Sequence, residues 1–368
     1  MLFRLPCAAL QQRAQREVST VIIFAALVAA CVANPAAAAR VAPADAVTRA
    51  NAASGGVWRA TPGGGLGSAH VFRLGATAPP SVQSHSRPPP AADGASAASL
   101  RESLPASFDS REAWHGCVGP VLDQGDCGSC WAVSTSSALS DRLCISERAS
   151  TERRGGAPAG DDATTDGMGR RAAPASRTEL SAAQLASCDR APWHPQSGNK
   201  GCEGGDPGAA IDYAADVGLV SAECAPYLEA DGGKYSTCPR ESEPCLEPFQ
   251  PTPSCPGSAL VRRCADGARW PPVEARARPN GTRIVQFEDH MAAELVARGP
   301  FVVTIEVYDD FVHYSSGVYT QTSDTFVGLH AIKLVGYGVT DNSTGNGTEY
   351  WLLQNSWTDA WVRGRVND

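Results

Sequence analysis

The order of apolar and polar residues predicts helices early in residues 104–368 and strands late. Apolar residues at helical spacing predict a helix over Trp131–Leu143, with Ser129 placed to cap its first turn. Gln184–Leu185 and Pro207–Val217 are weakly helical. Runs rich in β-branched and aromatic residues predict three strands: Phe301–Val307, Ala331–Tyr337 and Tyr350–Gln354. Helices followed by strands are typical of an α+β fold.

Two segments lack any such pattern. Residues 40–103 are rich in Ala, Gly, Pro and Ser and carry no sustained period of 2 or 3.6, so we interpret them as a propeptide or low-complexity linker. Aromatic residues and cysteines appear regularly after Leu104, which marks the start of a folded domain over 104–368. Within it, residues 147–177 are again of low complexity and predict an exposed insertion.

The N-terminal residues have the order of an export signal. Three arginines precede an apolar run, Val21–Ala33, and small residues follow at Ala36–Ala39. We interpret residues 1–39 as a signal peptide, which places the chain in the secretory pathway without membrane contact after cleavage. An uncleaved signal anchor is the alternative, although the apolar run is short for a membrane span.

Composition narrows the class of protein. With 43% hydrophobic and 19% charged residues, the chain can bury a sizeable core. The net charge of -8 is spread along the chain, and basic residues form only short pairs such as Arg153–Arg154 and Arg262–Arg263. We therefore expect no nucleic-acid partner.

The cysteine count is high and odd after export. Of 13 cysteines, Cys7 and Cys31 fall within the predicted signal peptide, which leaves ten that could pair and one over. An oxidising compartment favours disulfides, so the remaining cysteine is either an accident or a reactive thiol.

The stretch Gln124–Ala132 (QGDCGSCWA) resembles the nucleophile segment of papain-like cysteine peptidases. The resemblance makes Cys130 the nucleophile, at a helix N-terminus whose partial positive charge favours a thiolate. A disulfide half-cystine at Cys130 and a dithiol redox pair with Cys127 are the alternatives. Trp131 favours the nucleophile, because redox pairs usually have a tryptophan before the first cysteine.

Two later motifs resemble the rest of this family's catalytic site. Gly328–Gly338 (GLHAIKLVGYG) resembles its histidine strand and makes His330 the general base, while Tyr350–Trp357 (YWLLQNSW) makes Asn355 the amide that orients the imidazole. Core or surface roles for His330, and a turn role for Asn355, remain open. Six other histidines occur, and none of them precedes an apolar run that ends in Gly-Tyr-Gly. They are His70, His85, His115, His194, His290 and His313.

The same resemblance assigns the substrate-binding residues. Gln124, six residues before Cys130, would contribute its amide to the oxyanion hole. Gly204 and Gly205 match the family's glycine wall, where substrate backbone lies close, although a bare turn also explains them. Trp357 would line the cleft and shield the imidazole–amide hydrogen bond.

A cysteine-rich stretch, residues 224–264, resembles the cathepsin B-like branch of the family. With the insertion 147–177, it accounts for the 200 residues between Cys130 and His330, against about 130–150 in the plain pattern. The resemblance implies five disulfides: Cys117–Cys144, Cys127–Cys202, Cys188–Cys255, Cys224–Cys264 and Cys238–Cys245. Cys130 is then the cysteine left over.

The family resemblance implies a two-lobed α+β fold and a cysteine-type endopeptidase in a lysosome- or vacuole-like compartment or outside the cell. It implies peptide or protein substrates, cystatin-type inhibitors, and no cofactor or metal. Residues 238–245 lack the paired histidines of the cathepsin B occluding loop, so we expect little dipeptidyl carboxypeptidase activity. After Trp357 the sequence departs from the family pattern and ends, so we expect a truncated C-terminus. The alternative function is a catalytically silent secreted binding protein on the same fold. N-glycosylation motifs occur at three positions: Asn280, Asn342 and Asn346.

Overall fold

The structure is a computed structural model that describes mainly residues 44–61, 103–153, 177–227, 288–340 and 347–358, with single-residue gaps and a few isolated positions outside these ranges. Helices and strands are both present, which confirms the expected α+β class. The helices are α3 (Ala44–Ala53), α5 (Ser110–Ala113), α6 (Cys130–Arg153), α7 (Ala182–Cys188), α8 (Pro207–Val217) and α9 (Glu288–Arg298). The strands are β1 (Leu2–Phe3), β2 (Trp58–Ala60), β3 (Phe108–Asp109), β4 (Phe301–Tyr308), β5 (Tyr314–Tyr319), β6 (Phe326–Val339) and β7 (Glu349–Gln354).

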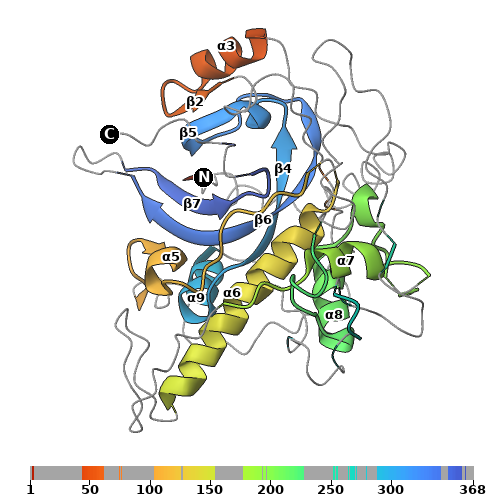
Figure 1. The fold of residues 1–368 in the computed structure, drawn as a ribbon. Helices are drawn as coiled ribbons and strands as arrows, with labels where there is room; N and C mark the ends of the chain where they lie inside the picture. The colour runs from red at the N-terminus through yellow and green to blue at the C-terminus, as the bar shows by residue number, and fades with distance from the viewer. Residues whose placement is uncertain are drawn as a thin grey trace, which may run out of the picture.

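The strand-rich lobe is built around β6. This 14-residue strand pairs antiparallel with β3, β4 and β7 and curves across the middle of the molecule in Figure 1. Its apolar residues alternate between two buried surfaces, with Ile332 and Leu334 packed against Leu295 of α9. Strand β1, which falls within the predicted signal peptide, pairs with β5 and β7.

The helical lobe gathers α7 and α8 beside the start of α6 (Figure 1). Trp131, Leu185 and Tyr213 form its core, and all three side chains are fully buried. Helix α8 begins where its sequence predicts, because Asp206 caps it by accepting from the Gly208 amide and Pro207 fits the first turn. The two lobes meet along α6 and β6.

Three features differ from expectation in their extent or contacts. Helix α6 continues through Arg153 and so includes the first seven residues of the predicted insertion 147–177; residues 154–176 lie outside the described part. The Ser129 hydroxyl contacts the hydroxyl of Tyr227 instead of capping α6. Within residues 40–103, which carry no sustained period and which we interpret as a propeptide or linker, α3 and β2 form, and β2 pairs with β5.

Disulfides join loop segments to α6, to α7 and to one another. The structure contains four of the five pairs implied by the family resemblance: Cys117–Cys144, Cys127–Cys202, Cys188–Cys255 and Cys224–Cys264. Cys238 and Cys245 lie outside the described residues. Among the helices described, none is both long and apolar enough to cross a bilayer.

Candidate active site

Cys130 lies at the first residue of α6, where the helix meets β6. Its side chain is fully buried, and among the described cysteines it alone forms no disulfide. The backbone amide of Ala331 donates a hydrogen bond to the Cys130 sulfur, with a distance of 3.5 Å between nitrogen and sulfur. The nucleophile motif and the histidine motif, 200 residues apart, therefore come into direct contact.

His330 is held by Asn355 across the neighbouring strand end. The distance from His330 Nε2 to Asn355 Oδ1 is 2.7 Å, and the same oxygen accepts from the Ser356 amide. An amide oxygen only accepts, so Nε2 is the donor and the hydrogen is assigned to it. The other ring nitrogen, Nδ1, is buried and has no hydrogen-bond partner among the described residues.

Burial sets the protonation state of this imidazole. It lowers the pKa of His330 to about 4, and the hydrogen bond to Asn355 opposes the shift only in part. Trp357 covers the ring from one side, with centroids 4.7 Å apart and planes inclined by 28°. In this closed arrangement the imidazole is neutral at neutral pH.

Gln124 is fixed by three hydrogen bonds in the loop before α6. Its Nε2 donates to the carbonyl of Cys127 (2.9 Å), and its Oε1 accepts from the hydroxyl of Ser356 (2.6 Å). Its backbone amide donates to the Ser356 carbonyl (2.9 Å). Sequence reasoning missed Ser356 in this role; its only signal was its place next to Asn355.

Tyr227 is a second residue that sequence reasoning missed. Its hydroxyl donates to the Gln124 carbonyl (3.1 Å) and contacts the Ser129 hydroxyl. Burial raises the pKa of this phenol well above its usual value, so it stays protonated. Tyr227 thereby braces both the loop that carries Gln124 and the residue before Cys130.

The glycine pair lies beside the nucleophile. A Cβ at Gly205 would come within 2.6 Å of the Trp131 ring and of Asn199 Oδ1, so side-chain packing alone already requires glycine there. Gly204 has a φ of 114°, which also favours glycine. The disulfide Cys127–Cys202 ties this turn to the nucleophile loop.

Two described residues within 40–103, Leu74 and Ala76, contact the lobes next to the glycine pair. Ala76 forms a parallel bridge with Gly205, and its amide donates to the Leu329 carbonyl (3.3 Å). Leu74 lies against Gly328, where an added Cβ would be 3.1 Å from it. The segment thus touches the glycine turn on one lobe and the residue before His330 on the other.

Comparisons with known proteins identify the family of the chain. The model of the "Papain family cysteine protease" family matches residues 104–153 and 163–364. The chain belongs to the papain family. Cathepsin B-like cysteine proteinase 1 of Haemonchus contortus is 32% identical over 274 residues, 70% of this chain and 66% of that protein, so the match spans just under two thirds of the relative. Cathepsin B-like cysteine proteinase 5 of Caenorhabditis elegans is 31% identical, in a match that covers 72% of this chain and 69% of that protein.

A solved structure shows the same fold. Procathepsin B S9 from Trypanosoma congolense superposes with a TM-score of 0.59 at 29% identity, covering 88% of this chain and 90% of that one. The predicted resemblance to the cathepsin B-like branch is confirmed. Because the match covers 88% of this chain, it extends to residues before 104; in this part of the chain, α3 and β2 pack on the strand-rich lobe.

Some predicted site residues cannot be placed. Asn280, Asn342 and Asn346 lie outside the described residues. Within the described part of the chain, no cluster of three His, Cys, Asp or Glu side chains could hold a metal ion. Of the competing histidines, His194 bonds Asp189 (2.8 Å) in the helical lobe, and His313 is buried in the other lobe.

Proposed function

We propose that this chain is a cysteine-type endopeptidase that acts through Cys130, His330 and Asn355. The observation that carries the proposal is the contact of Cys130 with β6 beside a histidine whose second nitrogen is bonded to an amide oxygen. A thiol, an imidazole and an orienting acceptor in this order are what nucleophilic attack on a peptide carbonyl requires.

The reaction proceeds in two acyl-transfer steps. The Cys130 thiol gives its proton to His330 Nδ1, and the thiolate attacks the carbonyl carbon to form a tetrahedral oxyanion. Gln124 Nε2 and the Cys130 amide donate to that oxyanion. His330 protonates the leaving amine as the C–N bond breaks, which leaves a thioester. His330 then takes a proton from water, the hydroxyl attacks the thioester, and the carboxylic acid and the thiol are released.

Residues 40–103 act as a propeptide in this proposal, after removal of residues 1–39. The contacts of Leu74 and Ala76 with both lobes support it, because a chain lying there excludes substrate. The buried, neutral His330 supports it too, since removing the segment exposes the imidazole and lets its pKa rise.

The finer assignments extend the same proposal. Residues 238–245 contain no histidine, which supports endopeptidase activity without strong release of C-terminal dipeptides. Substrates are peptides or proteins, cystatin-type proteins inhibit, and the enzyme works in a lysosome-like compartment or outside the cell, with glycans at Asn280, Asn342 and Asn346.

The test is labelling with a peptidyl epoxide that alkylates active-site thiols. After acid activation, we expect stoichiometric labelling located at Cys130 by mass spectrometry, with matching loss of peptide hydrolysis and no label on the Cys130→Ala variant. Soluble, disulfide-intact protein that takes no label would overturn the peptidase proposal and favour a silent binding protein on this fold.

A further inference from the structure

Behind Cys130, one face of α6 carries a row of polar residues. Ser134, Ser137 and Asp141 follow Cys130 at intervals of four, three and four, the spacing that keeps helical residues on one face. All three side chains, Ser134, Ser137 and Asp141, are buried. Buried polar residues at this spacing need partners on the element that the helix faces.

Those partners are on β6. The Ser134 hydroxyl donates to the Ala331 carbonyl (2.9 Å), and Lys333 Nζ donates to the Ser137 hydroxyl (2.8 Å) and to Asp141 Oδ2 (2.7 Å). We call this row the α6–β6 seam; its members are Ser134, Ser137, Asp141, Ala331 and Lys333. The seam joins the element that carries Cys130 to the one that carries His330.

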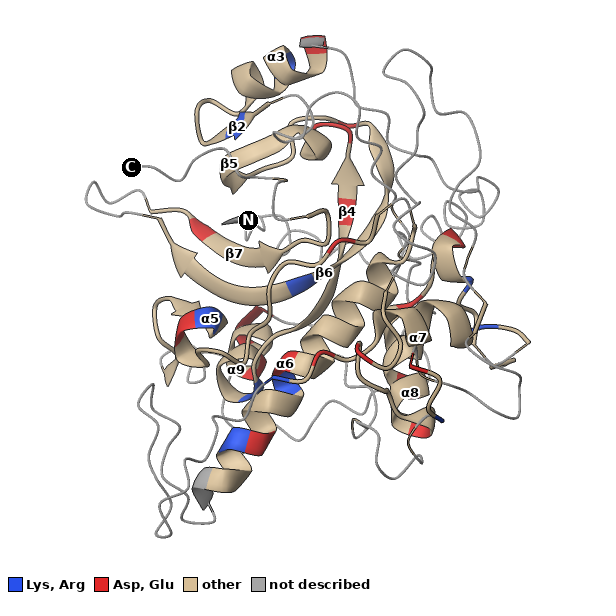
Figure 2. Cartoon of the chain, in the orientation of Figure 1, with Lys and Arg blue, Asp and Glu red and all other residues tan. Residues whose placement is uncertain are grey.

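The buried ion pair of the seam, Lys333 with Asp141, has a high desolvation free energy. Lys333, the one charged residue of β6 (Figure 2), is 2% exposed, and Asp141 is 0% exposed. Moving such charges from water costs several kcal/mol per ion, and apolar replacements of buried pairs are often at least as stable. Burial lowers the pKa of Lys333, and Asp141 opposes that shift. Stability alone therefore does not account for the pair.

Asp141 also connects the seam to β7, the strand that Asn355 directly follows. Its Oδ1 accepts from the Gly119 amide (3.0 Å) and from Arg177 Nε (2.8 Å). The Gly119 carbonyl in turn accepts from Gln354 Nε2 (3.0 Å), and Gln354 immediately precedes Asn355. One carboxylate thus links α6, which bears Cys130, β6, which bears His330, and the end of β7, which Asn355 follows.

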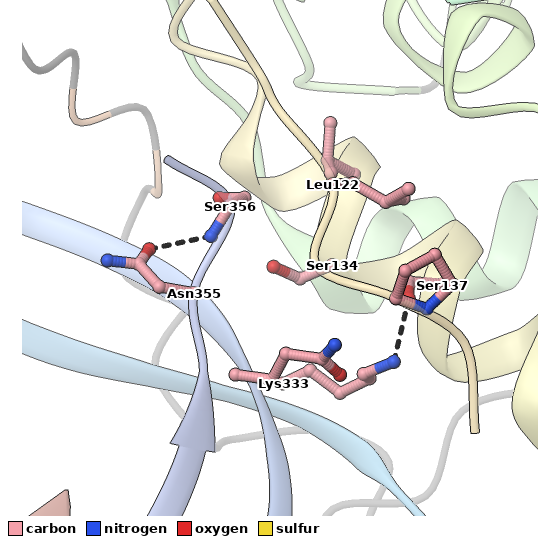
Figure 3. Close-up of a pocket in the computed structure, with 9 residues that line it drawn as sticks. Leu122, Ser134, Ser137, Lys333, Asn355 and Ser356 are labelled. Atoms are coloured by element: carbon pink, nitrogen blue, oxygen red, sulfur yellow. Dashed lines mark hydrogen bonds between the residues drawn. The ribbon is translucent and has the colours of Figure 1, made fainter. Parts of the chain in front are cut away.

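Beside the seam, α6 and β6 also share apolar contacts, since Trp131, Ala132 and Ala331 belong to one buried cluster. A small pocket lies between the seam and the end of β7, lined by Leu122, Ser134, Ser137, Lys333, Asn355 and Ser356 among others (Figure 3). In Figure 3, Lys333 extends from β6 to Ser137, while Asn355 and Ser356 lie on the other side. Apolar contacts have no preferred direction, whereas hydrogen bonds do, so the polar contacts of the seam set the register of α6 against β6.

We propose that Lys333, held by Asp141 and Ser137, is a positioning residue that sets the approach of Cys130 Sγ to the His330 imidazole. The inference rests on the proposed peptidase function of that pair. Lys333 touches no substrate; it acts through the two elements that it joins.

The test substitutes Lys333→Met in the full chain, followed by acid activation. Asp141 keeps its bonds to Arg177 and Gly119, so its charge stays compensated and the fold is retained. Per titrated active site, kcat falls roughly tenfold while KM stays within about twofold, because misplacement of reacting groups by less than an ångström acts on the chemical step. The pH profile of iodoacetamide alkylation of Cys130 also shifts, since that rate reports coupling of the thiol to His330.

Arg142→Met is the matched control. Arg142 also bears a charge on α6, and it ion-pairs with Glu294 (2.9 Å) and donates to the Gly299 and Pro300 carbonyls, away from the seam. This variant loses thermal stability, while its kcat and alkylation profile match the wild type. Lys333→Arg, which keeps the positive charge, recovers most of the kcat.

The possible results distinguish the positioning role of Lys333 from the peptidase proposal itself. Wild-type kcat and alkylation profile in Lys333→Met, or equal losses in Arg142→Met, would overturn the positioning role while leaving the peptidase proposal intact. Wild-type protein that takes no epoxide label overturns both. If Lys333→Met does not fold, Ser137→Ala removes one Lys333 contact without removing a charge; a kcat about threefold lower at unchanged KM supports the role, and an unchanged kcat refutes it.

Discussion

Trp58 anchors the proposed propeptide to the strand-rich lobe. It belongs to β2, is 3% exposed, and packs with ring centroids 5.0 Å from Tyr319 and 6.2 Å from Tyr314. Its neighbour Val57 is 47% exposed and makes no comparable contact. Replacing Trp58 by alanine therefore removes the largest apolar contact of β2 while leaving its pairing with β5 possible.

The size of the effect follows from burial. Large-to-small changes of a buried tryptophan cost about 3–5 kcal/mol, and we take about 3 kcal/mol because the contact is between a segment and a lobe. At about 1.4 kcal/mol per factor of ten, the open, undocked form of the Trp58→Ala chain becomes roughly 150-fold more populated. Cys130 in the unprocessed chain becomes accessible in proportion.

The assay measures the rate of epoxide labelling of the unprocessed chain at neutral pH, where self-processing is slow. We expect labelling about two orders of magnitude faster in Trp58→Ala than in the wild type or in Val57→Ala. If all three chains are labelled at one rate, the docking of β2 does not restrain the site, and the propeptide role of this segment is wrong.

The remaining predictions concern the site and its pH dependence. Gln124→Ala should lower kcat by about 10²–10³ at little change in KM, and Ser356→Ala, which only frees the Gln124 amide to rotate, by about tenfold, in steady-state assays. Asn355→Ala should narrow the pH range of activity, because the imidazolium loses an acceptor, and a full pH–rate profile tests this. Burial lowers the pKa of His330 from 6.5 to about 4, so the unfolded chain takes up this proton first as the pH falls. The free energy of unfolding of the unprocessed Cys130→Ala chain should drop by about 3 kcal/mol between pH 6.5 and 4, and an added His330→Gln change should remove that drop in urea titrations.

Local signals explain which elements could be predicted from the sequence. Pro207–Val217 was predicted to the residue because Asp206, Pro207 and Gly218 mark its ends. The strands β4, β6 and β7 were found at their apolar centres but extend further, since pairing with neighbours continues past the apolar run. Helix α6 ran past its predicted end because residues 147–153 favour helix without an apolar period.

Contacts between distant residues could not be predicted. Ser356 and Gln124 are 232 residues apart, and Tyr227 lies 103 residues from Gln124. Lys333 reads locally as a polar interruption of an apolar strand, and only the packing of α6 on β6 brings it to Asp141. The three-residue β2 has no period of its own and owes its existence to Trp58 and the edge of β5.

In the proposed mechanism, covering of the cleft and loss of the proton from His330 are coupled, because burial of the imidazole lowers its pKa. The thiolate–imidazolium pair needs an imidazole that holds its proton at the working pH, and a pKa of about 4 does not allow this above mildly acidic conditions. Leu74 lies against Gly328, and Ala76 contacts Leu329 and Gly205, so in the proposal the segment at this point keeps out both substrate and the water that would solvate the cation. Acid then has two effects in this proposal. Protonation of His330 makes its burial unfavourable and so favours the open form, and the exposed imidazolium then favours ionisation of the Cys130 thiol. On this proposal the segment inhibits by covering the imidazole, a role that a stretch of low complexity can fill.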